Sequence, residues 1–123
     1  MTDNPIIRMF TWWNAAFRAD DFTAQGFAQH FTDTAPFIVD GGVRGTGPAQ
    51  IATHFAGIRA ACTAVELVVP PLASLCDDAQ GFVHYRCTYT ADGKSGSEVC
   101  MAHARFENGR IARFEVIGRI EAA

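Results

Sequence analysis

The spacing of apolar residues changes once along this chain, near Thr63, and that change restricts the fold more than any other feature. Before it, apolar side chains recur every three or four residues, which is typical of helices that bury one face. After it, they alternate with polar side chains in runs that turn residues separate, which is typical of strands with one covered face. This order predicts an α+β domain with helices packed on one face of a curved, mostly antiparallel sheet.

Three helices are expected before the change. The first begins at Pro5, a residue that suits the first turn of a helix, and ends near 19–20. Its cap is one of Thr2, Asp3 and Asn4. Its buried face is formed by residues at helical spacing: Ile6, Met9, Phe10, Trp13, Ala16 and Phe17.

A short strand and a glycine-rich loop separate the second helix from the third. The strand covers 36–39 and ends in a carboxylate, Asp40, and the loop covers 41–47. Pro48 opens the third helix. The loop lacks the lysine of a phosphate-binding loop, so nucleotide binding is not predicted. The expected caps are Asp20 or Asp21 for the second helix and Thr46 for the third.

The strands after the change are predicted from alternation and from the turns between them. A four-residue loop over 92–95 places Cys87 opposite Cys100, where oxidation would join the two thiols and a reduced cell leaves them free. The turn at Asn108-Gly109 needs one extra residue, a bulge at Gly109, to keep the buried faces in register. The expected strands cover 65–69, 72–76, 82–90, 97–106 and 110–120.

Alternation also assigns the two faces of these strands. Tyr85, Cys87 and Tyr89 point toward the helices, together with Cys100 and Ala102. Glu98 falls on the same inward positions and is either a polar group for a ligand or a surface residue. An outer-face patch, open to solvent or to a partner, is formed by His84, Arg86, His103 and Arg105.

Composition restricts the class of protein further. The 123 residues suit a single domain over 1–123, and the net charge of −3 does not favour binding to nucleic acid or to anionic membranes. No apolar stretch is long enough to span a bilayer, and the N-terminus does not resemble a signal peptide. The four cysteines have no paired spacing and no set of side chains has metal-ligand spacing, so a reduced, cytoplasmic protein without metal or cofactor is expected.

Four strings of residues resemble a known superfamily. They are WWNAAFRADDF (12–22), HFTDTAPFIVDGG (30–42), GTGPAQIATHF (45–55) and ARFENGRIARFEV (104–116). With them the chain resembles the nuclear transport factor 2-like superfamily, in its SnoaL-like and ketosteroid isomerase-like branch. The resemblance implies a cone-shaped fold, with three N-terminal helices on a strongly curved sheet around an apolar pocket. It also implies a homodimer through the outer-face patch.

Ketosteroid isomerases use a strand-end aspartate as base, with a tyrosine and a protonated aspartate as oxyanion hole. The resemblance places Asp40 near the base and Trp13, which donates through its indole N–H, at the tyrosine. Ala102 stands where the protonated aspartate is expected and donates nothing, so efficient steroid isomerisation is not expected.

Two interpretations of the function stay open. In the first, an enzyme related to isomerases and polyketide cyclases acts on a small apolar carbonyl compound: Asp40 moves a proton, while Trp13 and a tyrosine hydroxyl hold the enolate. In the second, the chain is a non-catalytic binding or dimerisation module, and Asp40 is an ordinary turn residue. The expected ligand pocket is lined by Phe17, Phe27, Phe31, Phe37, Phe55, Tyr85, Tyr89, Ala102 and Phe114.

Overall fold

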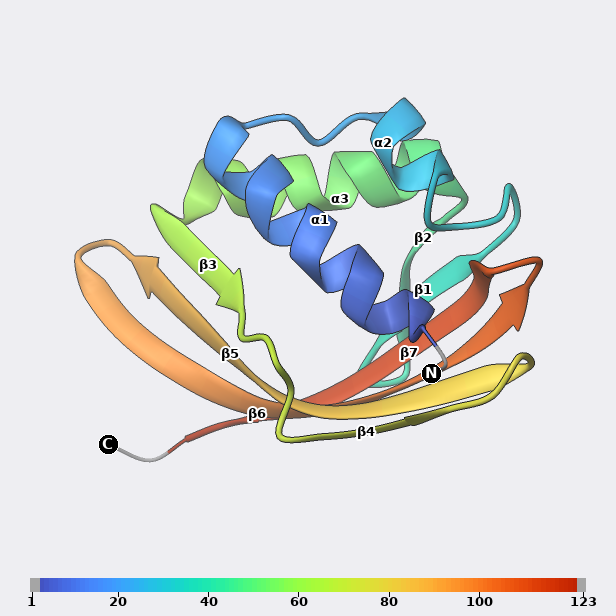
Figure 1. Ribbon diagram of the computed structural model, residues 1–123. Coiled ribbons are helices and arrows are strands. Elements are labelled where there is room, and N and C mark those ends of the chain that lie inside the picture. Colours follow the sequence, from blue (N-terminus) through green and yellow to red (C-terminus); the bar gives the residue numbers. More distant parts are fainter. Residues whose placement is uncertain (1–2, 122–123) are drawn as a thin grey trace.

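The computed structural model describes residues 3–121 and contains there three helices and seven strands (Figure 1). The helices are α1 (Pro5–Ala19), α2 (Ala24–Ala28) and α3 (Pro48–Ala61). The strands are β1 (Pro36–Val39), β2 (Gly42–Thr46), β3 (Ala64–Leu67), β4 (Ala73–Cys76), β5 (Gln80–Ala91), β6 (Lys94–Glu107) and β7 (Arg110–Ile120). The predicted α+β architecture with three helices is confirmed.

All seven strands belong to one curved sheet. Its order is β2-β1-β7-β6-β5-β3, with β4 also paired to β5. Only the β1–β7 pair is parallel among the described strands, so the sheet is mostly antiparallel, as predicted. Figure 1 shows the helices on the concave side of the sheet, and α1 and α3 both end near β3. No helix within residues 3–121 has the length and apolar character needed to cross a bilayer.

Aromatic rings fill the space between the helices and the sheet. Phe114 of β7 stacks on Phe37 of β1, with ring centres 5.4 Å apart. Phe10 of α1 packs on Tyr85 of β5 at 4.6 Å. The inward positions of β6 carry small side chains such as Ala104, which is fully buried, and this leaves room for the rings of α1. Burial of this apolar area is the main stabilising term of such a domain.

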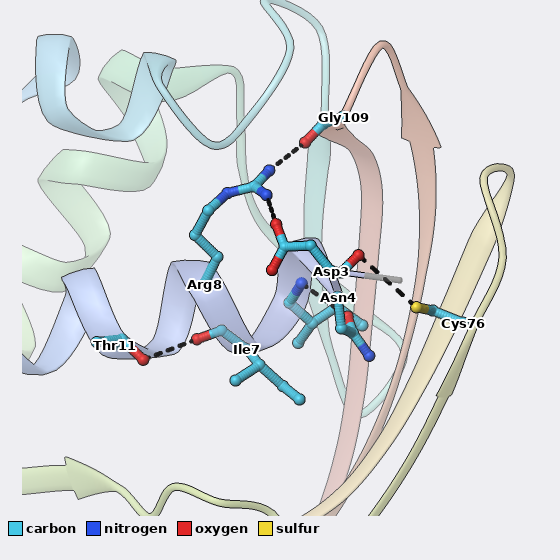
Figure 2. Close-up of polar contacts among 8 residues, drawn as sticks. Asp3, Asn4, Ile7, Arg8, Thr11, Cys76 and Gly109 are labelled. Carbon is cyan, nitrogen blue, oxygen red and sulfur yellow. Dashed lines mark hydrogen bonds and ion pairs between the residues drawn. The ribbon is translucent and has the colours of Figure 1, made fainter. Parts of the chain in front are cut away.

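The first helix begins as predicted. Asn4 is its cap, and its side chain accepts a hydrogen bond from the backbone N–H of Ile6 at 2.9 Å. Thr2, another expected candidate, lies outside the described residues. Figure 2 shows Arg8 in the next turn, ion-paired with Asp3 and donating to the backbone oxygen of Gly109 at 2.7 Å. Arg8 therefore joins the start of α1 to the β6–β7 turn.

The other two caps differ from expectation. Asp20 adopts a left-handed conformation (φ 53°) that ends α1, so it cannot begin α2. Thr23 caps α2 instead, because its hydroxyl accepts from the backbone N–H of Gly26 at 3.0 Å. Gly47 precedes Pro48 at the start of α3 without a side-chain cap, and Thr46 belongs to β2.

The predicted glycine-rich loop is wrong for most of its length. Asp40 and Gly41 form a two-residue turn with positive φ angles of 48° and 85°, the conformation that favours glycine and aspartate in tight hairpins. The residues after this turn form β2, which pairs antiparallel with β1.

The predicted register of β5 and β6 is wrong by two residues. The turn is the pair Asp92-Gly93, so Tyr85 lies opposite Cys100, whereas Cys87 was expected there. Because side chains alternate with a period of two, the inward and outward faces are unchanged. The predicted extra residue between β6 and β7 is confirmed, but the register shifts beside Arg105, not at Gly109.

Asn14 of α1 closes the free edge of β3. Its Nδ2 donates to the backbone oxygen of Leu67 at 2.8 Å, and its Oδ1 accepts from the backbone N–H of Leu67 at 2.9 Å. The Asn14 side chain is buried. One amide side chain thus takes the place of a neighbouring strand at the point where β3 ends.

Candidate functional site

An open hollow of about 920 Å³ lies at the end of the cone where α1 and α3 terminate above β3, β5 and β6. We call it the mouth hollow. Its inner wall and rim include Phe17, Arg59, Val65, Tyr89, Gly96 and Ile120. This volume is within the range of small-molecule sites.

A ladder of inward side chains leads from the mouth hollow into the cone. Tyr89 pairs with Gly96 at the mouth, and its hydroxyl lies so close to Gly96 that a Cβ there would be 2.7 Å away. The next inward pair is Cys87 with Glu98, and the next is Tyr85 with Cys100. Polar groups therefore line an otherwise apolar inner face in a fixed order.

Glu98 is the carboxylate on this ladder. It is half-buried, and its Oε2 lies 3.0 Å from where a Cβ on Gly118 of β7 would stand. The absence of a side chain at Gly118 therefore makes the space that the carboxylate occupies. Within residues 3–121 no arginine, lysine or histidine forms an ion pair with Glu98. Glu98 is therefore an inward carboxylate without a basic partner in the described part of the chain.

Tyr85 carries the deeper of the two tyrosine hydroxyls on this inner face. It is 4 % exposed and lies under the ring of Phe10. Burial, followed by the neighbouring Cys100 and Cys87 thiols, raises the pKa of Tyr85 well above its usual range. The hydroxyl therefore stays protonated at neutral pH.

The two inner cysteines are unreactive thiols. Burial raises the pKa of Cys87 to about 12, and the neighbouring Cys100 thiol and then Glu98 add to this effect. Burial and then Glu98 raise the pKa of Cys100 to about 11. Both groups are therefore protonated at neutral pH and are poor nucleophiles or metal ligands. Within residues 3–121 no cluster of three His, Cys, Asp or Glu side chains has a geometry that could hold a metal ion.

Asp40 lies at the tip of the β1–β2 turn and is exposed. Its Oδ1 accepts from the backbone N–H of Gly118 at 3.3 Å. The side chains of Asp40 and Glu98 therefore lie beside the same glycine of β7. Asp40 accepts a hydrogen bond from its backbone N–H, and Glu98 lies where its Cβ would stand. The role of Asp40 as a base stays a prediction.

Trp13 lies in the core of the helical layer. It is 2 % exposed, and its ring centre lies 5.5 Å from that of Phe17 and 5.4 Å from that of Phe55. Its indole Nε1 is buried and has no hydrogen-bond partner among the described residues. A buried donor without an acceptor is unfavourable, and Trp13 does not itself line the mouth hollow. Its role as a donor also stays a prediction.

The expected pocket residues divide among three places. Phe17 and Tyr89 line the mouth hollow. Tyr85 and Ala102 are buried on the inner face of the sheet. Five further rings pack against one another in the closed part of the cone: Phe27, Phe31, Phe37, Phe55 and Phe114. Sequence reasoning missed Arg59 because an arginine in the last turn of a helix is common.

The outer face of the sheet is a second surface of interest. The outer-face patch points away from the helices, and within it Arg86 forms an ion pair with Glu121 at 2.7 Å. Apolar side chains that are half or more exposed lie beside the patch around a groove of about 410 Å³: Leu75, Phe82, Met101 and Ile117. The predicted homodimer through this face stays a prediction. A cluster of exposed apolar side chains supports it.

A charge placed in this cluster tests the dimer. We expect the wild-type chain to sediment as a dimer at micromolar concentration, and Met101→Glu to weaken association at least about tenfold by burying an unpaired charge. Val43→Glu is the matched control, because Val43 is 61 % exposed on β2, away from the outer-face patch. A monomeric wild type in sedimentation velocity would contradict the prediction.

Comparison with known proteins identifies the family. The family model of the SnoaL-like domain matches residues 10–114. No curated protein matches the sequence.

Solved structures with the same fold share little sequence with this chain. A putative isomerase from Rhodopseudomonas palustris has a TM-score of 0.76 at 16% identity, covering 96% of this chain and 91% of that one. An NTF2-like protein from Anabaena variabilis has a TM-score of 0.75 at 11% identity, covering 100% and 96%. An LEH-like epoxide hydrolase from M. tuberculosis has a TM-score of 0.70 at 16% identity, covering 94% and 83%. The chain thus has the NTF2-like fold and belongs to the family of SnoaL-like domains.

Proposed function

We propose that this protein binds a small, apolar carbonyl compound in the mouth hollow and moves a proton at the carbon next to the carbonyl, as an isomerase or a cyclase does. The observation that carries the proposal is Glu98, a half-buried carboxylate without an ion-pair partner in the described part of the chain, one step inward from the hollow. Solved structures named as an isomerase and an epoxide hydrolase share the fold, which supports chemistry on small molecules in this cone.

The proposed reaction is a proton transfer through an enolate. The Glu98 carboxylate takes the proton from the carbon next to the carbonyl, the C–H electron pair forms the C=C bond, and the carbonyl oxygen gains the negative charge. Glu98 then returns the proton to the same carbon or to a conjugated one. The donors that we assign to this oxygen are the protonated hydroxyl of Tyr85 and the unpartnered indole N–H of Trp13.

Asp40 is the second candidate for the base. Its Oδ1 accepts a hydrogen bond from the backbone N–H of Gly118, the glycine beside which Glu98 lies, at 3.3 Å. Asp40 is exposed at the tip of a turn, whereas Glu98 is half-buried on the inner face of the sheet, so Glu98 is the base that we propose.

Deuterium exchange into simple ketones tests the proposal, because any compound with protons next to a carbonyl can report the reaction. Cyclohexanone and cyclohex-2-enone are incubated with the wild-type chain in D₂O, and the loss of the signals of protons next to the carbonyl, or conjugated to it, is followed by NMR. We expect faster loss with the protein than with buffer, and a rise in melting temperature with the same compounds. Binding without faster exchange would instead support the alternative, a non-catalytic binding module.

A further inference from the structure

Arg59 stands in the last turn of α3 and lines the mouth hollow. Two contacts with Phe17 hold its guanidinium: Nε donates to the backbone oxygen at 2.8 Å, and Cζ lies 5.0 Å from the ring centre. An arginine held in this way has lost much of its conformational freedom before a ligand arrives. Ordering it on binding therefore costs little.

The fold does not need Arg59 to satisfy the backbone oxygen of Phe17. The backbone N–H of Asp20 already donates to the same Phe17 oxygen at 3.1 Å, so that oxygen is satisfied without Arg59. Within residues 3–121, Arg59 has no ion-pair partner, and its two Nη atoms have no hydrogen-bond acceptor. The two Nη atoms form the planar pair of donors that matches the two oxygens of a carboxylate.

The other charges around the mouth hollow do not cancel this positive charge. Arg18 adds a second one at the end of α1. Of the two carboxylates on the lining, Glu121 is bound by Arg86 at 2.7 Å and by Ser97 at 2.8 Å. Glu66 is exposed on the edge strand β3. Among the described residues, Arg59 and Arg18 therefore have no acidic ion-pair partner at the mouth, and Arg59 is the one whose side chain is held in place.

We propose that the ligand carries a carboxylate, which Arg59 binds through its two Nη atoms at the mouth, and that its apolar carbonyl end extends inward toward Glu98. Val65, Tyr89 and Ile120 supply apolar wall between the two ends. This inference rests on the proposed function and narrows the substrate class to small keto or enone acids.

A matched pair of compounds tests the carboxylate. We expect 4-oxocyclohexane-1-carboxylate to bind the wild-type chain at least about tenfold more tightly than 4-oxocyclohexane-1-carboxamide in isothermal titration calorimetry, because a hydrogen bond between charged groups is worth more than a neutral one. Arg59→Gln should abolish this preference, while Arg18→Gln, on the same rim, should keep most of it. Equal affinities of the acid and the amide for the wild type, or no measurable binding of the acid, would overturn the inference.

Proton exchange separates this inference from the proposed function. If the acid is preferred through Arg59 but no exchange depends on Glu98, the anion site stands and the proposed reaction falls. If both compounds exchange protons in a Glu98-dependent way with equal affinities, the proposed reaction stands and the carboxylate site falls. The wild-type comparison needs no variant, so a folding defect in Arg59→Gln does not affect it.

Discussion

Glu98→Gln is expected to lower the rate of protein-catalysed proton exchange by about 100-fold or more, the usual contribution of a positioned general base. Glutamine has nearly the same shape as glutamate and fits the space that Gly118 leaves open. Its amide cannot accept a proton at neutral pH, however, so the variant keeps the site and loses the base. The measurement is the NMR exchange rate in D₂O, with ligand affinity measured beside it.

Asp40→Asn is the matched control for this prediction. It makes the same chemical change in the other carboxylate that contacts Gly118, and Asp40 is exposed in a turn that asparagine also tolerates. We expect this variant to keep most of the exchange rate. The reverse pattern, with exchange lost in Asp40→Asn and kept in Glu98→Gln, would assign the base to Asp40 and refute the assignment to Glu98.

Asn14→Ala is expected to lower the free energy of unfolding by about 2 kcal/mol or more, because two polar groups lose their partner and each costs about 1–3 kcal/mol when it is buried. The change removes both hydrogen bonds to Leu67 and leaves its backbone N–H and C=O without a partner at the edge of β3. Urea denaturation measures the loss. Amide exchange should become faster at Leu67, the residue that the side chain holds.

Thr11→Ala on the same helix is the control for Asn14→Ala. The Thr11 hydroxyl is exposed and donates only to the backbone oxygen of Ile7 at 3.1 Å, within the helix (Figure 2). Surface changes of this kind usually stay within about 0.5 kcal/mol. If Asn14→Ala costs no more than Thr11→Ala, the amide of Asn14 does not secure β3.

The helices and strands followed from the sequence where one local period dominated. The apolar spacing of α1 and the alternation along β5 to β7 arise from burial of one face, so residues alone reveal them. The turn at Asp92-Gly93 was missed because the surrounding glycine and serine residues also suit a longer loop. The strand β2 was missed because its glycines are typical of a loop, and only its pairing with β1 makes it a strand.

The candidate site was predictable only in part, for a similar reason. Alternation alone indicated that Tyr85 and Glu98 face inward, and the structure agrees. The lack of a basic partner for Glu98 depends on which elements pack against the inner face, and no local pattern contains that information. The contact between Arg59 and Phe17 joins the ends of two helices that are distant in the sequence. It becomes visible only when both helices lie over the same end of the sheet.

The parallel pairing of β1 with β7 makes the domain indivisible. In the sequence the β1–β2 hairpin lies between α2 and α3, but in the sheet β7 is the only described strand that joins this hairpin to the others. A cut anywhere between β1 and β7 therefore separates two paired strands, and a cut between α1 and α2 separates α1 from the sheet that it covers. The domain should lose its structure in one cooperative transition, which allows a single free energy of unfolding to describe it.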